Sequence, residues 1–350
     1  MTRFIDTLCI QRIIEKKGLT QFLSGLTEQL EHDYCEWESF DKCARVPSHS
    51  DIGVIELMPV ANTEKYAFKF VNGHPANTFK GLSTVMAFGA LAEVETGMPT
   101  LLSELTITTA FRTAATSVMA AKALARKNVK RMAMIGCGAQ SEFQCIAFHT
   151  LLGITEIQIF DIDLDAMNKL AEHLVAYPNL QIIKVNSPQD ACKNVDIITT
   201  CTADKKNADI LTPDMVSSGV HINAIGGDCP GKTELHPDIL NMTKTFVEYE
   251  PQTRVEGEIQ QMPEDYPTHD LWRVITGEIR GRESDSQITL FDSVGFALED
   301  YSALCHLENT AKALDEGEMI DLIPALENPK NLFGLLAPSN TLSALSTSNK

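Results

Sequence analysis

The chain has 350 residues, with 47 acidic and 29 basic side chains, and its formal net charge is −18. At roughly 150 residues per domain, this length predicts about two domains. The acidic balance and the lack of any Lys/Arg run argue against nucleic acid and anionic membranes as partners, because binding to such polyanions depends on cations that neutralise phosphates.

The sequence also argues against export and membrane insertion. No window approaches the roughly 18 consecutive apolar residues of a spanning helix, and Arg3, Asp6 and Arg12 interrupt the segment that a signal peptide would need apolar. The cysteines are scattered and do not form the close pairs of a zinc site or a thioredoxin motif. We therefore expect a cytoplasmic protein with reduced thiols and no metal site.

Up to about residue 107, one helix precedes several strands. Residues 10–32 have apolar side chains at helical spacing, whereas residues 53–58, 66–71 and 83–93 have extended patterns. Strands that follow one another through short turns indicate an antiparallel α+β unit. A long helix rich in Ala, Thr and Ser is expected at 108–125.

From Arg131 onward, strands alternate with helices, which predicts a doubly wound parallel sheet of the Rossmann type. Ser187-Pro188 and Thr212-Pro213 each place a capping hydroxyl before a proline, which is a common way to begin a helix. A helix from Ala303 is expected to return to the first unit. Strands of the sheet are expected at 131–135, 156–160, 180–185, 196–200, 220–225 and 288–292.

A glycine-rich turn, Gly136-Cys-Gly138-Ala-Gln-Ser141, follows the first strand of this alternation. Gly136 permits a tight turn, Gly138 leaves room for a pyrophosphate, and the next helix directs free N–H groups at that anion. Asp161 ends the next strand, where a carboxylate holds the ribose of NAD and repels the extra phosphate of NADP. The alternative is an ordinary strand-to-helix turn with Asp161 as a helix cap.

A second motif competes, because residues 226–233 match the phosphate-loop pattern of ATPases and kinases. In a true phosphate loop, a helix begins at the Lys-Thr pair. Pro237 would clash with the carbonyl of Thr233 in such a helix. We therefore favour a Gly/Pro loop at the carboxyl end of a strand, where open parallel sheets bind ligands, and keep Asp228 and Lys232 as candidates for chemistry.

Several motifs together resemble the ornithine cyclodeaminase/mu-crystallin family over nearly the whole chain. They are Arg45, Lys69-Phe-Val-Asn72, Arg112-Thr-Ala-Ala-Thr116, Gly136-Cys-Gly-Ala-Gln140 and Gly226-Gly-Asp228-Cys-Pro-Gly231-Lys232-Thr-Glu234. The resemblance implies an α/β protein with a Rossmann-type doubly wound parallel sheet domain at 116–304. An α+β substrate-binding and dimerisation domain would comprise 1–115 and 305–350. The Ser/Thr/Asn-rich tail at 337–350 is typical of disorder or of an arm that wraps a partner subunit.

The resemblance also implies an activity: conversion of L-ornithine to L-proline and ammonia, through hydride transfer from the α-carbon to NAD⁺ and its return after the imine has cyclised. A homodimer is implied as well. The alternatives are a cyclic imine (ketimine) reductase or an amino-acid dehydrogenase of the same family, or a crystallin-like protein that binds a small ligand without turnover.

Site residues follow from the resemblance in the same way. Arg45, Lys69 and Arg112 would hold the substrate carboxylate, for which cations are suited. Asp228 would donate and accept protons. Glu56 would accept the distal amine, and Val294 would lie beside the substrate.

Some residues of these motifs also have a simpler interpretation when they are considered alone. Lys69 would be a charge on the solvent face of a strand, Arg112 part of a helix salt bridge, and Cys137 a buried thiol.

The positions that the resemblance implies for NAD are Thr84, Arg112, Gly136, Gly138, Ala139, Gln140, Asp161, Thr202, Ala224, Ile225, Gly226, Gly227, Lys232 and Ser293.

Overall fold

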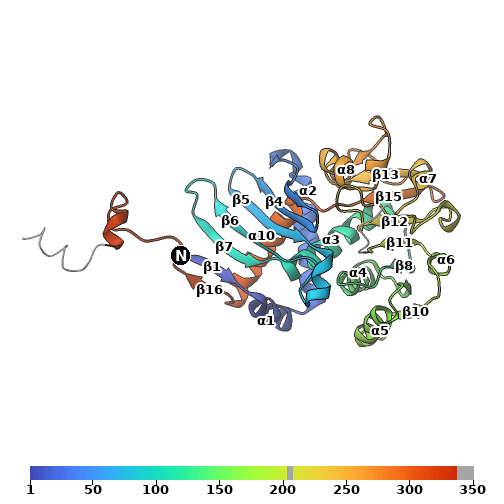
Figure 1. The fold of residues 1–350 in the computed structure, drawn as a ribbon, viewed down its shortest axis with the longest axis horizontal. Helices are drawn as coiled ribbons and strands as arrows, with labels where there is room; N and C mark the ends of the chain where they lie inside the picture. Colours follow the sequence, from blue (N-terminus) through green and yellow to red (C-terminus); the bar gives the residue numbers. More distant parts are fainter. Residues whose placement is uncertain (203–207, 337–350) are drawn as a thin grey trace, which may run out of the picture.

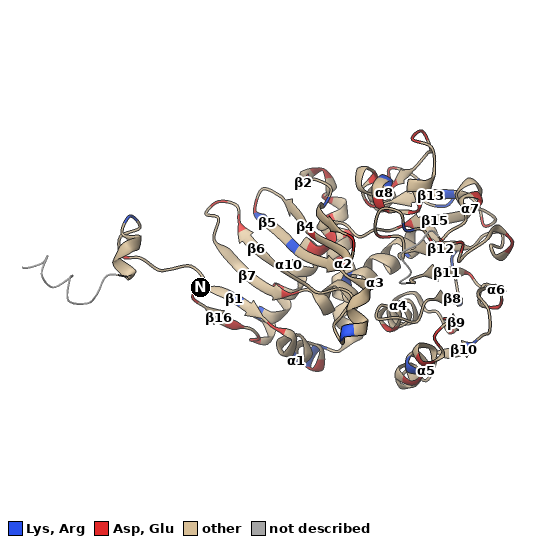
Figure 2. Ribbon diagram, viewed as in Figure 1, with Lys and Arg blue, Asp and Glu red and all other residues tan. Residues whose placement is uncertain are grey.

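The computed structural model describes residues 1–202 and 208–336, so the tail at 337–350 lies outside the described residues. Two eight-stranded sheets lie beside each other, with the long helices α3 (Thr106–Leu124) and α10 (Ala297–Leu314) next to the first sheet (Figure 1). The predicted domain boundaries, at residues 115/116 and 304/305, fall inside these two helices. Acidic residues occur over both parts of the ribbon, with lysines and arginines between them (Figure 2).

The first sheet confirms the predicted α+β unit. Its order is β16-β1-β7-β6-β5-β4-β2, with β3 also paired to β4. The β1–β7 pair is parallel and the other neighbours are antiparallel. The strands are β1 (Thr2–Ile5), β2 (Asp41–Lys42), β3 (Val46–Ser50), β4 (Gly53–Ala61), β5 (Lys65–Gly73), β6 (Ala87–Glu93), β7 (Pro99–Glu104) and β16 (Glu318–Ile320).

Two local predictions in this unit are wrong. The expected helix at 10–32 is two helices, α1 (Thr7–Lys17) and α2 (Leu19–Cys35), because Gly18 between them has φ of 82°, which breaks the helical path. The strand expected from residue 83 begins only at Ala87. Before it, the backbone pairs irregularly, with the Thr84 carbonyl accepting the His74 N–H.

The two faces of the first sheet differ. Alternation along β5 buries Ala67, Lys69 and Val71, and α10 packs against β4, β5, β6 and β7 on this inner face. On the outer face, apolar side chains remain exposed. They are Ile55, Leu57, Tyr66 and Phe88.

The second sheet confirms the predicted Rossmann-type fold. All its paired strands are parallel, in the order β10-β9-β8-β11-β12-β15-β13-β14. The chain leaves β8 toward β9 on one side and β11 lies on the other, so a ligand crevice is expected at the carboxyl ends of β8 and β11. The strands are β8 (Arg131–Ile135), β9 (Glu156–Phe160), β10 (Gln181–Lys184), β11 (Ile197–Thr200), β12 (His221–Ala224), β13 (Thr243–Val247), β14 (His269–Asp270) and β15 (Ile288–Asp292).

The helices that connect these strands are short. Ser187 caps its helix as predicted, since its Oγ accepts the Asp190 N–H. Thr212 does not, because its hydroxyl donates to Asp214 and only a 3-10 turn follows. The helices are α4 (Ser141–Ala147), α5 (Leu164–His173), α6 (Pro188–Ala191), α7 (Pro237–Met242), α8 (Glu250–Glu256) and α9 (Leu271–Ile275). No helix in the described ranges is long and apolar enough to cross a membrane.

Candidate active site

A cavity of about 420 Å³ lies between the inner face of the first sheet and the carboxyl ends of the parallel strands. Of the predicted site residues, it is lined by Arg45, Glu56, Lys69, Thr84, Arg112, Gly138, Ala139, Gln140, Thr202, Ile225, Gly226, Asp228, Lys232, Ser293 and Val294. Gly136, Asp161, Ala224 and Gly227 lie outside this lining. One cavity therefore brings together residues that are far apart in the sequence.

Lys69 is fully buried on the inner face of β5, so its interpretation as a solvent-facing charge is wrong. Its Nζ lies 2.7 Å from Oδ1 of Asp300 on α10. Burial, together with the nearby charge of Arg112, lowers the pKa of Lys69 to about 8, although Asp300 opposes this shift. The ion pair thus keeps a cation inside the protein near neutral pH.

Arg112, on α3, binds the same helix. Its Nε donates to Oδ1 of Asp300 at 3.1 Å, and its Nη1 donates to Glu299 at 2.8 Å. Among the described residues, no acceptor contacts its Nη2, so this edge of the guanidinium can receive a carboxylate. Gly295 makes room for it, since a Cβ there would lie 2.5 Å from Nη1.

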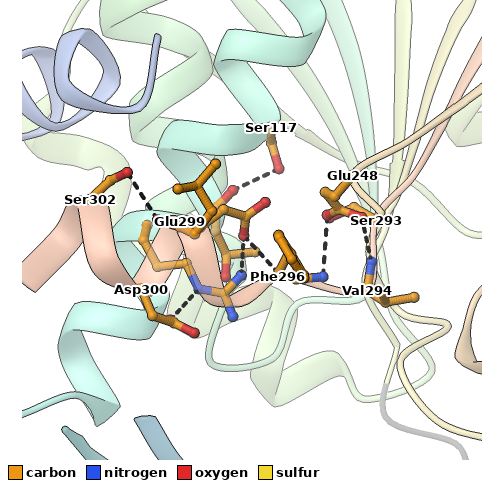
Figure 3. Close-up of polar contacts among 12 residues, drawn as sticks. Ser117, Glu248, Ser293, Val294, Phe296, Glu299, Asp300 and Ser302 are labelled. Atoms are coloured by element: carbon orange, nitrogen blue, oxygen red, sulfur yellow. Dashed lines mark hydrogen bonds and ion pairs between the residues drawn. The ribbon is translucent and has the colours of Figure 1, made fainter. Parts of the chain in front are cut away.

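Figure 3 shows Glu299 and Asp300 next to each other on α10, with Glu248 on the other side of Phe296. Glu248 orders the loop after β15. Its Oε1 accepts the Ser293 hydroxyl at 2.5 Å and the Gly295 N–H at 3.2 Å, and its Oε2 accepts the Val294 N–H at 3.3 Å. This buried carboxylate therefore holds the backbone beside the cavity.

Arg45 links the two halves of the site, although it precedes an exposed strand. Its Nη1 donates to Glu56 on β4 at 3.0 Å. Its Nη2 donates to the carbonyls of Val294 and Gly295, at 2.6 and 2.7 Å, and its Nε lies 3.0 Å from Oε2 of Glu256. The three predicted cations thus do share one cavity, but buried acids neutralise each of them.

Asp228 follows β12, in the loop at 226–232, and its side chain is 53% exposed. It forms an ion pair with the buried Lys232, whose Nζ lies 3.2 Å away. No helix begins at Lys232. The next helix, α7, begins at Pro237, capped by His236. The phosphate-loop alternative is therefore wrong, and this loop presents a carboxylate to the cavity instead.

The glycine-rich turn after β8 fits a dinucleotide. Gly136 has φ of 99°, and a Cβ on it would lie 2.3 Å from the Cys201 carbonyl oxygen. A Cβ on Gly138 would have no atom within 4 Å, so this position opens into free space. The buried Oε1 of Gln140 has no hydrogen-bond partner among the described residues, as expected of a group that meets a ligand.

Asp161 is tied to this turn, because its Oδ2 accepts the Cys137 N–H at 2.6 Å. It lies at the carboxyl end of β9, where the sequence placed it. Lys169 on α5, which the sequence did not indicate, donates to the carbonyls of Cys137 and Gly138 at 3.2 and 3.4 Å. Burial raises the pKa of Cys137 to about 12, which supports its interpretation as an unreactive thiol.

Apart from Glu56, the sequence analysis missed the buried acids around the cations: Glu248, Glu256, Glu299 and Asp300. One signal was available, because Glu299-Asp300 interrupts an apolar stretch from Phe296 to Leu304. Two adjacent acids in a helix buried on this face need cationic partners. For Glu248 and Glu256 no such signal exists in the sequence.

A model of the ornithine cyclodeaminase/mu-crystallin family matches residues 10–314. The chain belongs to this family. The ornithine cyclodeaminase of Brucella suis biovar 1 (strain 1330) is 53% identical over 333 residues, 95% of this chain and 93% of that protein.

Solved structures agree with this family assignment. A lysine cyclodeaminase, studied for its recognition of L-lysine, L-ornithine and L-2,4-diaminobutyric acid, has a TM-score of 0.90 and 25% identity, covering 95% of this chain and 99% of that one. An archaeal alanine dehydrogenase dimer with bound NAD has a TM-score of 0.83 and 30% identity, covering 92% and 99%. The resemblance inferred from the motifs is thus confirmed.

Proposed function

We propose that this family member is an ornithine cyclodeaminase, which converts L-ornithine to L-proline and ammonia with NAD as its cofactor. The observation that carries the proposal is one cavity in which Lys69 and Arg112 can receive a carboxylate while Glu56 and Asp228 can receive amines. Relatives about half identical over 95% of the chain, named ornithine cyclodeaminase, support it. The reaction would belong to cytoplasmic proline formation from ornithine.

For the cofactor, the chain offers a complete crevice at the switch point of the parallel sheet. Gly136, Gly138, Ala139 and Gln140 would receive the pyrophosphate, and Asp161 the adenosine ribose. When bound, NAD⁺ supplies a reversible acceptor for the hydride of the substrate α-carbon. The other residues proposed to contact it are Thr84, Arg112, Thr202, Ala224, Ile225, Gly226, Gly227, Lys232 and Ser293.

The substrate residues have complementary roles. Arg112, Lys69 and Arg45 bind the α-carboxylate, which orients the α-carbon toward the glycine-rich turn. Glu56, buried on the inner face of β4, accepts the distal ammonium. Val294, held by Glu248 and Arg45, packs on the aliphatic part of the substrate.

Asp228 moves the protons. Its half-exposed carboxylate can accept a proton from the α-ammonium, so that the amine lone pair assists loss of the hydride. After the δ-amine has attacked the imine carbon, the same carboxyl group can return the proton to the departing ammonia. Lys232, at 3.2 Å, keeps the carboxylate in place between these two steps.

The assay that tests this activity uses L-ornithine with catalytic NAD⁺ and measures proline, ammonia and NADH. Stoichiometric proline and ammonia without NADH accumulation is the expected result. Steady NADH formation would instead identify an amino-acid dehydrogenase. Reduction of a cyclic imine as the sole activity would identify a reductase, and no turnover at all would identify a small-ligand binder.

The outer face of the first sheet supports a homodimer. Apolar side chains on adjacent strands β4, β5 and β6 are exposed there, and a second copy would cover them. Light scattering should therefore give twice the chain mass at micromolar concentration. Leu57→Glu, which places a charge on this face, should shift the protein to monomers, whereas a wild-type monomer would contradict the proposal.

A further inference from the structure

Arg45 contacts several buried groups besides its ion-pair partner Glu56. Besides Glu56, its guanidinium contacts two carbonyls of the loop after β15 and the carboxylate of Glu256 on α8. Gln252, one turn earlier on α8, accepts the backbone N–H of Arg45 at 3.0 Å and donates to the Gly295 carbonyl at 2.8 Å. Helix α8 therefore restrains both the main chain and the side chain of Arg45.

Both terminal nitrogens of the guanidinium donate hydrogen bonds, whereas, among the described residues, the buried Nε forms an ion pair with Glu256 without a hydrogen bond. Nη2 donates to the Val294 and Gly295 carbonyls, Nη1 donates once to Glu56, and Nε faces Glu256. Within the part of the chain that the structure describes, one N–H of Nη1 remains without an acceptor. Arg45 thus meets a substrate with its orientation already determined and with one N–H of Nη1 directed to no other group that the structure describes.

We propose that Glu256 is a positioning residue, which acts through Arg45 to prepare the binding of the substrate carboxylate. The inference rests on the proposed function, since it takes Arg45 as a carboxylate ligand. Glu256 does not line the cavity. Its side chain lies behind the guanidinium and is 4% exposed, so its effect on a substrate must pass through Arg45.

The charge of Glu256 depends on pH in the neutral range. Burial, together with the charges of Glu56 and Asp228, raises its pKa to about 7, although Arg45 opposes this shift. These are the charged groups that face Glu256, from β4, from the loop after β12 and from the segment before β3. Above about pH 7 the carboxylate is ionised and holds Arg45; below it, the neutral acid releases Nε, and affinity for the carboxylate should fall.

The test compares Glu256→Gln with Glu250→Gln, a control at the start of the same helix whose side chain is half exposed. Ornithine kinetics are combined with calorimetric binding of L-proline to the NAD⁺-loaded protein. L-Proline has a carboxylate but no distal amine. In Glu256→Gln, KM for L-ornithine and Kd for L-proline should both rise about tenfold, which is about 1.4 kcal/mol, with kcat within about threefold. Glu250→Gln should match the wild type.

The pH profile separates positioning from a merely structural role. In the wild type, Kd for L-proline should rise as the pH falls from 7.5 to 6, and in Glu256→Gln it should be flat over this range. Glu256→Asp keeps the charge and should recover part of the affinity. If Glu256→Gln does not fold, the wild-type profile alone decides, and a flat profile would overturn the proposal.

Other outcomes also contradict it. Weaker binding of L-ornithine but not of L-proline would place Glu256 in the distal-amine subsite. If Glu256→Gln lost only kcat, or kept the wild-type KM, Glu256 would have no role in binding the substrate carboxylate. A wild-type protein that binds L-proline but makes none from L-ornithine would contradict the proposed activity and leave the test of Glu256 intact.

Discussion

The two walls of the cavity are built in opposite ways. On the antiparallel-sheet side, Lys69, Arg112 and Arg45 are buried cations whose positions are determined by paired acids on β4, α8 and α10. On the parallel-sheet side, the lining comes from loops that contain small residues such as Gly138, Ala139 and Gly226, with charge, among the described residues, only at the Asp228–Lys232 pair.

This difference indicates how each wall of the cavity binds its ligand. Recognition of a small zwitterion needs charges that are held in place before it arrives, because a buried cation without a partner is costly. A dinucleotide needs close approach to backbone N–H groups, which side chains would block. The first wall should therefore respond to changes of charge, and the second to added volume.

The largest effect is expected from Asp228→Asn, which removes the proton acceptor at the boundary of the two walls. The kcat for L-ornithine should fall at least about a hundredfold, while NAD⁺ affinity and the melting temperature stay unchanged. Asp238→Asn, an exposed acid at the start of α7, serves as the control. A rate within a few-fold of the wild type would show that another group moves the protons.

Asp300→Asn should damage the charged wall itself. Asp300 is shared by Lys69 and Arg112, and its loss leaves two buried cations short of a partner. Breaking a buried pair in this way costs about 3–5 kcal/mol, which urea unfolding would measure. Asp315→Asn, at the exposed end of the same helix, should leave stability unchanged. Equal stability of the two variants would show that Asp300 does not stabilise the buried Lys69 and Arg112.

Two glycines of one turn sharpen the contrast on the cofactor wall. Gly138→Val should raise Kd for NAD⁺ at least about tenfold without lowering the melting temperature, because the added atoms meet only open space. Gly136→Ala should instead cost about 1–3 kcal/mol of stability, since its φ of 99° and the Cys201 carbonyl oppose a Cβ. Equal effects on binding and stability in both variants would contradict this division.

The smallest expected effect is a weaker binding of the carboxylate at alkaline pH. Lys69 is charged below its pKa of about 8 and neutral above it, so Kd for L-proline should rise several-fold between pH 7.5 and 9.5. Lys69→Met should bind weakly at both pH values, with a flat profile. A wild-type Kd independent of pH in this range would show that Lys69 does not contact the carboxylate.

Much of this molecule can be predicted from local patterns. The alternation from Arg131 onward predicts the parallel sheet, and Gly136 and Gly138 mark its ligand end, because turn geometry depends on a few neighbouring residues. The split of the first helix was also readable, since Gly18 lies at the break. The burial of Lys69 was not, because strand alternation separates two faces without indicating which one is covered.

The sequence by itself thus determined the fold class, the glycine-rich turn and the motifs of the family, all of which depend on residues close together in the chain. The tertiary structure decided which acids meet which cations. Asp300 reaches Lys69 across 231 positions, and Glu256 reaches Arg45 from another helix. Such pairs leave no periodic pattern, because they arise only when distant elements pack and every buried charge must find its partner.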